Sequence, residues 1–567
     1  MFRRNVSHQQ PSLFGFAGQL PPAKRQRLQS SWEHEFYQRV FCQIREEDFA
    51  VLYAETSSRP NAPVNTLVAS IILMYRHHWT TEQLFDRIDF DLLTRLALGL
   101  DTLDVTPFCP ATFFNFQNRL SGHYARTGVN LLEKVFDGLT AAQLQALQIR
   151  TDIQRSDSFQ ALSNIRGYSR TQLLVEVLIR LHRVLRDEDR TRFAALLEPY
   201  VGQSSSQFIY GLERAEIPHQ LEQLGRLYHE LYEALKGGYP DDESFAVFAR
   251  VYREHFTVVE NQAAVKPCAQ LHGGILQSPD DLDATYRKKH GRDCRGQSIN
   301  VTETAHPENA LNLLTDVAVY ANNTDDSTIL GERLAAIQAK TPDLNELHTD
   351  GAYGSAANDR ALEERQITHV QTAVRGRPAE VSMAIEQAEE GNYTVTCPRQ
   401  SVPAQPARKR YKACFAAAVC AGCPGRDRCP AKPRDRKRTY YFDRSNYLLQ
   451  RRRKALALLP PERRTLRANV EATIRQFSGA MNHKGKLPVR GRFRTMVYAY
   501  ALAVSINFGR IWRYLAENPA LASLFRRILG LFYRRWAALR RKQKGWLSPS
   551  ASFPLIRLAE RLFLLAA

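Results

Sequence analysis

The sequence predicts an α/β protein: a mixed sheet flanked by helices, preceded by a helical domain and interrupted by a helical insertion. Two observations lead to this fold class. Short extended apolar segments alternate with helical patterns between about residues 149 and 374. A long stretch that is purely helical in pattern separates the first of these segments from the others. Alternation of this kind favours a sheet with helices packed on its faces.

The N-terminal part is expected to contain two regions. Residues 1–30 are polar and rich in Gln, Pro and Arg, which predicts a flexible basic arm. Residues 31–125 have a helical pattern, with Pro63 where a helix can begin and residues 80–84 as the capped start of a second helix. Compact helices joined by a short polar turn suit a DNA-binding helix-turn-helix module, and a bundle that only packs on the next domain is the alternative.

The α/β domain is expected to span residues 140–515. Its segments follow a β-β-β-α-β-α order, and residues 170–270, with an apolar stripe that begins at Leu173, are predicted to be an all-helical insertion. The predicted strands are 149–153, 298–304, 313–320, 347–350 and 367–374, and the predicted helices begin after the turn at 322–326 and at 357.

Three acidic residues occupy different local settings. Asp157 follows the alternating segment 149–153, Asp350 ends a short extended run at a Gly-containing turn, and Glu471 lies within a helical pattern. Two carboxylates at strand ends and one on a helix can converge on a pair of divalent cations. Carboxylates packed that closely raise one another's pKa unless a cation neutralises them. The three acids therefore predict a metal site, or else they are unrelated members of the 58 acidic residues in the chain.

Other acids compete for the same role. Asp325 and Asp326 are more simply explained as a turn and a helix cap, and Asp152 is five residues before Asp157. Asp316 lies in a predicted strand, and its side chain could point to either face of the sheet. It is the main alternative for an active-site acid. For the helix of Glu471 the alternative is an Arg467–Glu471–Arg475 ion-pair row on a solvated face.

The residues around the three acids are more specific than the spacing of the acids. The segments Asp157-Ser158-Phe159, Asp350-Gly351-Ala352-Tyr353-Gly354 and Asn469-Val470-Glu471-Ala472 resemble the catalytic motifs of bacterial insertion-sequence transposases of the DDE type. Residues 278–287 and 301–309 resemble the strands that follow the first acid in that family. The resemblance covers most of the chain, roughly residues 45–515, with several blocks in the right order.

This resemblance implies a ribonuclease-H-like fold and a two-metal cut-and-join reaction in which Asp157, Asp350 and Glu471 hold two Mg²⁺ ions. It implies double-stranded DNA as partner, both terminal inverted repeats and target, bound by a homodimer, and the family branch whose members carry a helical N-terminal domain. Arg467 matches the arginine four residues before the last acid and is expected to contact DNA. Arg464 and Ser478 stand where the family has Tyr and Lys, so Arg475, Lys484 and Lys486 are the expected phosphate contacts near Glu471 instead.

Four cysteines form a second chemical signal. Cys420 and Cys423 make a C-x₂-C pair, Cys429 follows six residues later, and Cys397 precedes them. Four thiolates suit one tetrahedral Zn²⁺; an iron–sulfur cluster and ordinary reduced thiols are the alternatives. The segment 399–438 has few apolar residues, so a metal is expected to supply the folding energy that a core would give.

The cysteines lie in a basic insertion at residues 395–440. Its cations are interleaved with tyrosines, a pattern that suits a clamp on the DNA backbone as well as an ordinary solvated face. The residues expected to contact DNA here are Arg408, Lys409, Arg410, Arg436, Lys437 and Arg438. A basic amphipathic tail is expected at residues 516–567, for contact with DNA or another subunit.

The overall composition agrees with a polyanionic partner. The net charge is +20 and the isoelectric point about 9.6. The sequence has no apolar run of membrane-spanning length and no signal-peptide pattern, which predicts a cytoplasmic, nucleoid-associated protein without a membrane partner. A non-catalytic DNA-binding descendant and a nuclease that cleaves without joining are the alternative functions.

Overall fold

The structure is a computed structural model that describes residues 1–518, apart from 10–11, 13–14, 56–58, 290, 375, 377–378, 390, 435 and 483. The chain divides into two compact units, Met1–Phe508 and Gly509–Ala567. The sites described below all belong to the first unit. The predicted tail 516–567 lies, apart from its first three residues, outside the described residues. No helix among the described residues has the length and apolar character needed to cross a membrane.

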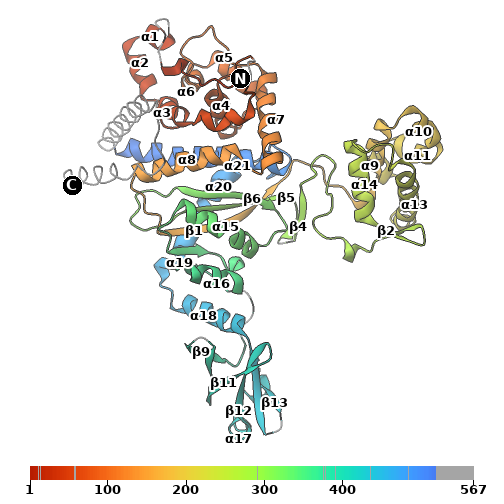
Figure 1. The fold of residues 1–567 in the computed structure, drawn as a ribbon, viewed down its shortest axis with the longest axis vertical. Helices are drawn as coiled ribbons and strands as arrows, with labels where there is room; N and C mark the ends of the chain where they lie inside the picture. Colours follow the sequence, from red (N-terminus) through yellow and green to blue (C-terminus); the bar gives the residue numbers. More distant parts are fainter. Residues whose placement is uncertain are drawn as a thin grey trace. The chain divides into compact units, whose positions relative to one another are not determined.

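The N-terminal part is helical, as the sequence predicts for residues 31–125. Pro63 is the N-cap of α4, and Thr80 and Gln83 form a capping box at the start of α5. Residues 16–29 are helical where a flexible arm is expected, because Phe16 and Leu28 are buried and Arg25 donates to the carbonyls of residues 17 and 18. The helices are α1 Phe16–Gln19, α2 Pro22–Gln29, α3 Trp32–Arg39, α4 Val64–His77, α5 Thr81–Phe90, α6 Leu92–Ala97, α7 Pro110–Thr127 and α8 Leu131–Ala146 (Figure 1).

A mixed sheet forms the centre of the α/β domain. Its strands are β1 Ile153–Leu162, β4 Thr285–Lys289, β5 Arg292–Thr304, β6 Leu314–Ala321, β7 Glu346–Thr349 and β8 Thr368–Gln371. The order across the sheet is β6–β5–β1–β7–β8, and β4 pairs with the first half of β5. Strands β5 and β6 are antiparallel to their neighbours, whereas β7 and β8 run parallel to β1. Apart from β4, which was not predicted, the strands and helices of this domain follow the predicted order.

The first strand differs from its predicted bounds. It begins at Ile153, where the expected strand ends, so Asp157 lies in the middle of β1 rather than after a strand. The polar run Ser156-Asp157-Ser158 hides the strand pattern, yet β1 is central because β5 and β7 pair on either side of it. Asp350 does follow its strand, as expected.

Helices cover both faces of this sheet. The side-chain amide of Gln154 donates a hydrogen bond to the hydroxyl of Thr341 at the end of α15, which places α15 on one face. On the other face, the ring centroids of Phe159 and of Phe477 in α20 are 5.6 Å apart. The helices of the domain are α15 Asp326–Lys340, α16 Ala356–Glu364, α18 Arg444–Leu458, α19 Pro461–Ala468, α20 Val470–Ser478 and α21 Arg492–Glu517, of which the part up to Phe508 belongs to the first unit.

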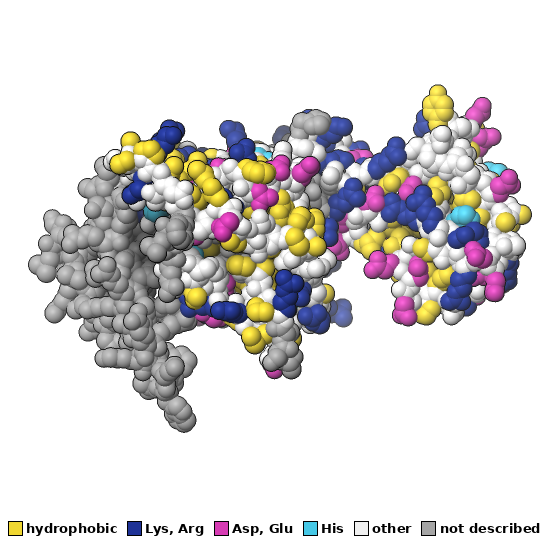
Figure 2. All heavy atoms as spheres, turned by 90° about the horizontal axis from the view of Figure 1, so that it is seen from above, with side chains coloured by type: hydrophobic (Ala, Val, Ile, Leu, Met, Phe, Trp, Pro, Cys, Tyr) yellow, Lys and Arg dark blue, Asp and Glu magenta, His cyan; other side chains and the backbone are white. Residues whose placement is uncertain are grey.

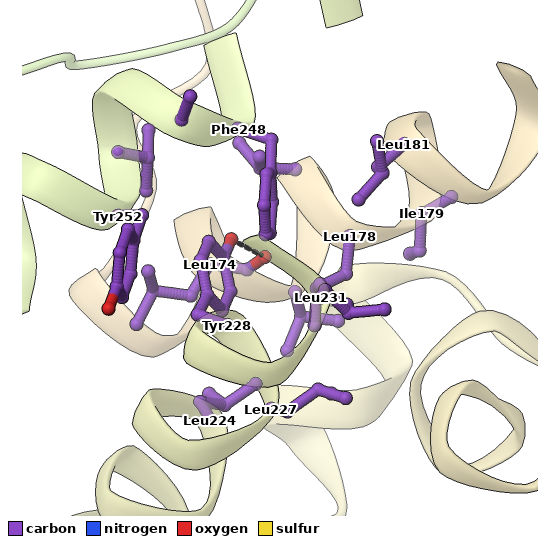
Figure 3. Packing of buried hydrophobic residues seen from close by; sticks show 14 of the residues in the cluster. Leu174, Leu178, Ile179, Leu181, Leu224, Leu227, Tyr228, Leu231, Phe248 and Tyr252 are labelled. Carbon is purple, nitrogen blue, oxygen red and sulfur yellow. Dashed lines mark hydrogen bonds between the residues drawn. The ribbon is translucent and has the colours of Figure 1, made fainter. Parts of the chain in front are cut away.

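The predicted helical insertion is present between β1 and β4. Its core is formed by apolar side chains from α9, α13 and α14, and the hydroxyl of Tyr228 donates to the carbonyl of Leu174 at 2.7 Å (Figure 3). It is not all-helical, because a short antiparallel hairpin, β2 Phe256–Val259 and β3 Gln262–Val265, follows α14. The helices are α9 Arg170–Val184, α10 Asp187–Arg192, α11 Ala194–Val201, α12 Ser205–Tyr210, α13 Ile217–Leu235 and α14 Glu243–His255.

The cysteine-rich segment folds as a second sheet, which the sequence did not predict. Its strands are β9 Ala384–Glu389, β10 Asn392–Thr396, β11 Ser401–Ala407, β12 Arg410–Ala416, β13 Lys432–Arg434 and β14 Lys437–Phe442, in the order β13–β14–β12–β11–β10–β9, with the short helix α17 Ala417–Ala421. Met383, Tyr393, Val395, Phe415 and Phe442 are buried in its core. The expectation that this segment lacks a core of its own is therefore wrong.

Candidate functional site

Asp157 and Asp350 lie side by side because their strands are parallel and in register. The pairing of β1 with β7 places Arg155 opposite His348, and both chains continue two residues further to Asp157 and Asp350. Side chains two residues apart on a strand share a face. Both acids therefore lie on the face of the sheet that α19 and α20 cover.

The carboxylate of Asp157 is buried and charged groups surround it. Burial raises its pKa to about 6, the Arg467 guanidinium opposes this rise, and the neighbouring charge of Asp350 adds to it. Its Oδ1 accepts from the amide of Ser158 at 2.9 Å and its Oδ2 accepts from Arg467. Asp350 caps the short 3₁₀ helix Gly351–Tyr353, and its Oδ1 accepts from the amide of Ala352 at 2.7 Å.

Glu471 is linked to Asp157 through an arginine. It lies in the first turn of α20, its side chain is 57% exposed, and its Oε1 is 3.7 Å from Nη1 of Arg467. The same guanidinium donates to Asp157. Arg467 therefore links the first and third predicted acids. Of the alternative ion-pair row, the Arg467–Glu471 pair is present, and Arg467 also pairs with the buried Asp157. Arg475, one turn after Glu471, is exposed.

A buried ion pair beside Asp157 was not predicted from the sequence. Arg155 of β1 and Glu303 of β5 pair at 2.7 Å and are 4% and 0% exposed. Arg155 also donates to the carbonyl of Leu466 in α19, and Glu303 accepts from the hydroxyl of Thr473 in α20. Because the partners are 148 residues apart in sequence, no local pattern could reveal the pair.

The competing acids have other partners. Asp316 is fully buried, and Arg333 and Lys340 hold its pKa below its ordinary value even though burial acts to raise it. Across the sheet, Asp316 is aligned with Thr302 of β5 and Ser156 of β1, which directly precedes Asp157. Neighbouring residues on a strand point to opposite faces, so the side chain of Asp316 lies on the face opposite to that of Asp157. Asp152 pairs with Arg150 at 3.0 Å.

The remaining acids near the sheet, and the histidine before Asp350, have structural roles. Asp325 is the N-cap residue of α15, and Asp326 in its first turn accepts from the Ser158 hydroxyl at 2.5 Å. His348 of β7 is fully buried. Burial lowers its pKa to about 4, and the charge of Arg155 acts in the same direction.

The aspartate pair suits a hard divalent cation. Carboxylate oxygens are the ligands that Mg²⁺ prefers, and two close carboxylates, one of them buried with a raised pKa, favour a cation between them. Over the described residues, however, no three His, Cys, Asp or Glu side chains gather closely enough to hold a metal ion together. Glu471 thus stands apart from the pair, with Arg467 between them.

The four predicted cysteines line one pocket of the second sheet. Cys397, Cys420, Cys423 and Cys429 surround it together with Arg426 and Arg438. The backbone amide of Gln400 donates to the sulfur of Cys397 at 3.3 Å. The side-chain amide of Gln400 donates to the sulfur of Cys420 at 3.4 Å. Burial raises the pKa of Cys420, as do the nearby Cys397 and Cys429. Here too, within the part of the chain that the structure describes, no three of the cysteine sulfurs lie close enough together to hold one metal ion.

The predicted DNA contacts are in different environments. Arg408, Lys409 and Arg410 form the exposed turn between β11 and β12, and Arg410 stacks on Tyr441 at 3.9 Å. Arg436 and Lys437 are exposed, whereas the Arg438 guanidinium donates to the carbonyls of residues 426 and 431. Lys484 is exposed, and Lys486 donates to the carbonyl of Ile165 at 2.5 Å. On the face drawn in Figure 2, Lys and Arg side chains are interspersed with acidic ones.

Comparison with known proteins gives a match to part of the chain. A family model described as a transposase DDE domain matches residues 395–512. The matched range contains the four cysteines, Arg467 and Glu471, whereas Asp157 and Asp350 lie outside it. No curated protein and no solved structure matches the chain significantly.

Proposed function

We propose that this chain, whose residues 395–512 match a transposase DDE domain, is a DDE transposase that cleaves DNA at the ends of a mobile element and joins the cut ends to target DNA. The observation that carries the proposal is the register of β1 and β7, which sets Asp157 beside Asp350 on the face covered by the helix of Glu471. The strand order β6–β5–β1–β7–β8, with Asp157 in β1 and Asp350 directly after the neighbouring β7, supports a ribonuclease-H-like fold for this domain.

In this proposal Asp157 and Asp350 hold the divalent cations, and Glu471 completes the site from α20. Two Mg²⁺ ions, when bound, would activate the attacking water or DNA 3′-hydroxyl and stabilise the leaving oxygen. Arg467 compensates the charge of Asp157 and is close to both Asp157 and Glu471. Its guanidinium is also suited to bind a DNA phosphate at the site.

The basic turn Arg408–Arg410 and the exposed residues Arg436, Lys437, Arg475 and Lys484 are proposed to contact the phosphate backbone. The helical N-terminal part is proposed to recognise the terminal inverted repeats, and a homodimer is proposed to bring two ends together. The exposed, cation-rich turn supports the first of these proposals, and the consecutive helices α4 and α5, joined by a short turn, support the second.

The test compares single-residue variants in cleavage and in DNA binding. Asp157→Asn, Asp350→Asn and Glu471→Gln should each lower strand cleavage by several orders of magnitude, because the loss of one ligand misplaces nucleophile and leaving group together. DNA binding should stay near that of the unchanged protein, since phosphate contacts dominate affinity. Glu462→Gln is the matched control, because Glu462 and Glu471 are the two acids of α19 and α20.

The outcomes separate the alternatives. Near-normal cleavage by any of the three variants would show that residue to be wrongly assigned. A protein that cuts DNA in Mg²⁺ but yields no joined product is a nuclease. One that binds the ends of the element and never cleaves is a DNA-binding descendant.

We also propose that Cys397, Cys420, Cys423 and Cys429 bind one structural Zn²⁺. Their shared pocket and the N–H donors from Gln400 to two of the sulfurs support this. The test is metal analysis of the purified protein, with about one zinc per chain expected. Cys420→Ser/Cys423→Ser should release it, with Cys414→Ser as control outside the pocket. Protein without bound metal, and a double variant that binds DNA normally, would mean that these are ordinary thiols.

A further inference from the structure

A buried ion pair lies on the sheet face that carries the predicted acids. Arg155 of β1 and Glu303 of β5 occupy paired positions in the register, with Nε and Oε1 2.7 Å apart. A buried ion pair costs solvation free energy, and its attraction compensates for this only when further hydrogen bonds satisfy the remaining groups. The partners that supply those hydrogen bonds therefore show which neighbouring elements the pair holds in place.

Both additional hydrogen bonds reach the segment that contains Arg467 and Glu471. Nη1 of Arg155 donates to the carbonyl of Leu466 at 2.9 Å, and the hydroxyl of Thr473 donates to Oε2 of Glu303 at 2.6 Å. Leu466 directly precedes Arg467, and Thr473 follows Glu471 by two residues. The carbonyls in the last turn of a helix lack helical partners, so the Leu466 carbonyl at the end of α19 is suited to accept from a side chain.

The same pair is also tied to the first acid. Arg155 is two residues before Asp157 on β1 and shares its face of the sheet. A single pair of buried charges thus joins the strand of Asp157 to both ends of the segment 466–473.

We infer that Arg155, Glu303 and Thr473 are positioning residues, which fix the junction of α19 and α20 so that Glu471 and Arg467 are held over Asp157. This inference rests on the proposed function. None of the three residues is assigned to contact DNA or metal. Their effect passes through the position of Glu471.

The sharpest test is Thr473→Val, which removes one hydroxyl and leaves the Arg155–Glu303 pair intact. Hydrogen exchange of the amides between 467 and 473, measured without metal or DNA, should become about tenfold faster, as expected when a local tether is removed. Strand cleavage should fall about 10- to 100-fold, the usual effect of a residue that orients a metal ligand, and the Mg²⁺ concentration for half-maximal rate should rise. Thr473→Ser keeps the hydroxyl, so its exchange rate, its cleavage rate and its Mg²⁺ dependence should match those of the unchanged protein.

Thr315→Val is the matched control. Thr315 is 3% exposed on β6 and donates at 2.6 Å to Oε1 of Gln154, on the opposite face of the same sheet. This variant removes an equivalent buried hydrogen bond, so it should affect stability similarly but leave exchange in 467–473 and the Mg²⁺ dependence unchanged. Equal effects of Thr315→Val and Thr473→Val would overturn the positioning role, and so would unchanged exchange in Thr473→Val.

A second variant keeps the test open if Thr473→Val does not fold. Arg155→Lys retains a cation next to Glu303 but shortens the reach to the Leu466 carbonyl, and it should also speed exchange in 467–473. Normal exchange in a folded Arg155→Lys protein would contradict the inference. Hydrogen exchange is measured without substrate, so it tests the positioning role even if the chain never cleaves DNA. Absence of cleavage would refute the proposed function alone.

Discussion

Asp157 illustrates how opposing effects act on one side chain. Burial and the charge of Asp350 raise its pKa, while the Arg467 guanidinium lowers it, and the net rise shows that burial dominates. A carboxyl in this setting holds a proton more readily than one in water, and an added cation would favour its charged form. The guanidinium of Arg467 is a cation of this kind, and it contacts the carboxylate directly.

Asp316 is expected to behave differently from Asp157 when its charge is removed. In Asp316→Asn, Arg333 and Lys340 would each be left without their ionised partner on this buried side chain. Breaking a buried ion pair from one side costs about 3–5 kcal/mol of unfolding free energy. Urea unfolding should show this loss, and the fraction that stays folded should still cleave DNA. Loss of cleavage in folded Asp316→Asn protein would make this residue part of the active site.

The sequence could not separate these two aspartates. Both lie in strands within polar or mixed surroundings, and only the register of β1, β5 and β6 shows that they point to opposite faces. The position of Asp350 could be predicted because the glycine turn after it marks the end of its strand. The boundaries of β1 could not, since Ser156 and Ser158 beside Asp157 interrupt its apolar alternation.

At the scale of single elements, the helical insertion is held together by its own apolar core. Phe248 is fully buried and stacks on Tyr228 at 4.6 Å (Figure 3). Phe248→Ala should lower the unfolding free energy of this segment by about 3–5 kcal/mol, because it leaves a cavity. Tyr210, 95% exposed at the end of α12, is the control, and Tyr210→Ala should change stability by less than about 0.5 kcal/mol. Pulse proteolysis in urea measures both; equal losses would mean that the core is placed wrongly.

The same insertion should lose stability in mild acid. Burial lowers the pKa of His255 to about 3, and the charges of Arg170 and Lys266 act in the same direction. An unfolded histidine titrates near 6.5, so between that pH and the folded pKa the unfolded chain binds the extra proton. Stability therefore falls as the pH decreases, by about 2 kcal/mol for this group between pH 7.5 and 5.

The measurement is urea unfolding of the insertion, followed by pulse proteolysis at pH 7.5 and 5. His255→Gln keeps an acceptor for Arg170, whose Nε donates to Nδ1 of His255 at 3.2 Å, but cannot titrate. Its pH dependence should be shallower than that of the unchanged protein by about the same 2 kcal/mol. An unchanged pH dependence in His255→Gln would show that this histidine titrates normally in the folded chain.

The second sheet is the element that sequence reasoning missed. Its strands carry charged and polar residues at most outward positions, and its core is small, so periodicity gave no strand signal strong enough to outweigh the cysteines and cations. The cysteine spacing did identify four residues that line one pocket. This sheet has a core of its own, so no metal is needed to replace a missing one.

At the scale of the whole molecule, the net charge of +20 should appear as a strong salt dependence of DNA binding. Replacing Arg408, Lys409 and Arg410 together by Ala should reduce the slope of log affinity against log salt by up to about 3, because each phosphate that is no longer neutralised accounts for about 0.9. Arg214, Arg226 and Lys236, exposed on the helical insertion, give a control with the same change of charge. If both triple variants changed the slope of log affinity against log salt equally, the β11–β12 turn would have no specific role in DNA binding.

The central claim is that Asp157, Asp350 and Glu471 act as one unit, and double substitution tests it most directly. The measurement is the single-turnover rate of strand cleavage in Mg²⁺ for Asp157→Asn, Glu471→Gln and the double variant. Residues that serve one reaction centre have non-additive effects, so the double variant should be slowed about as much as the more impaired single variant. Losses that multiply, or a single variant that cleaves at a near-normal rate, would contradict the claim.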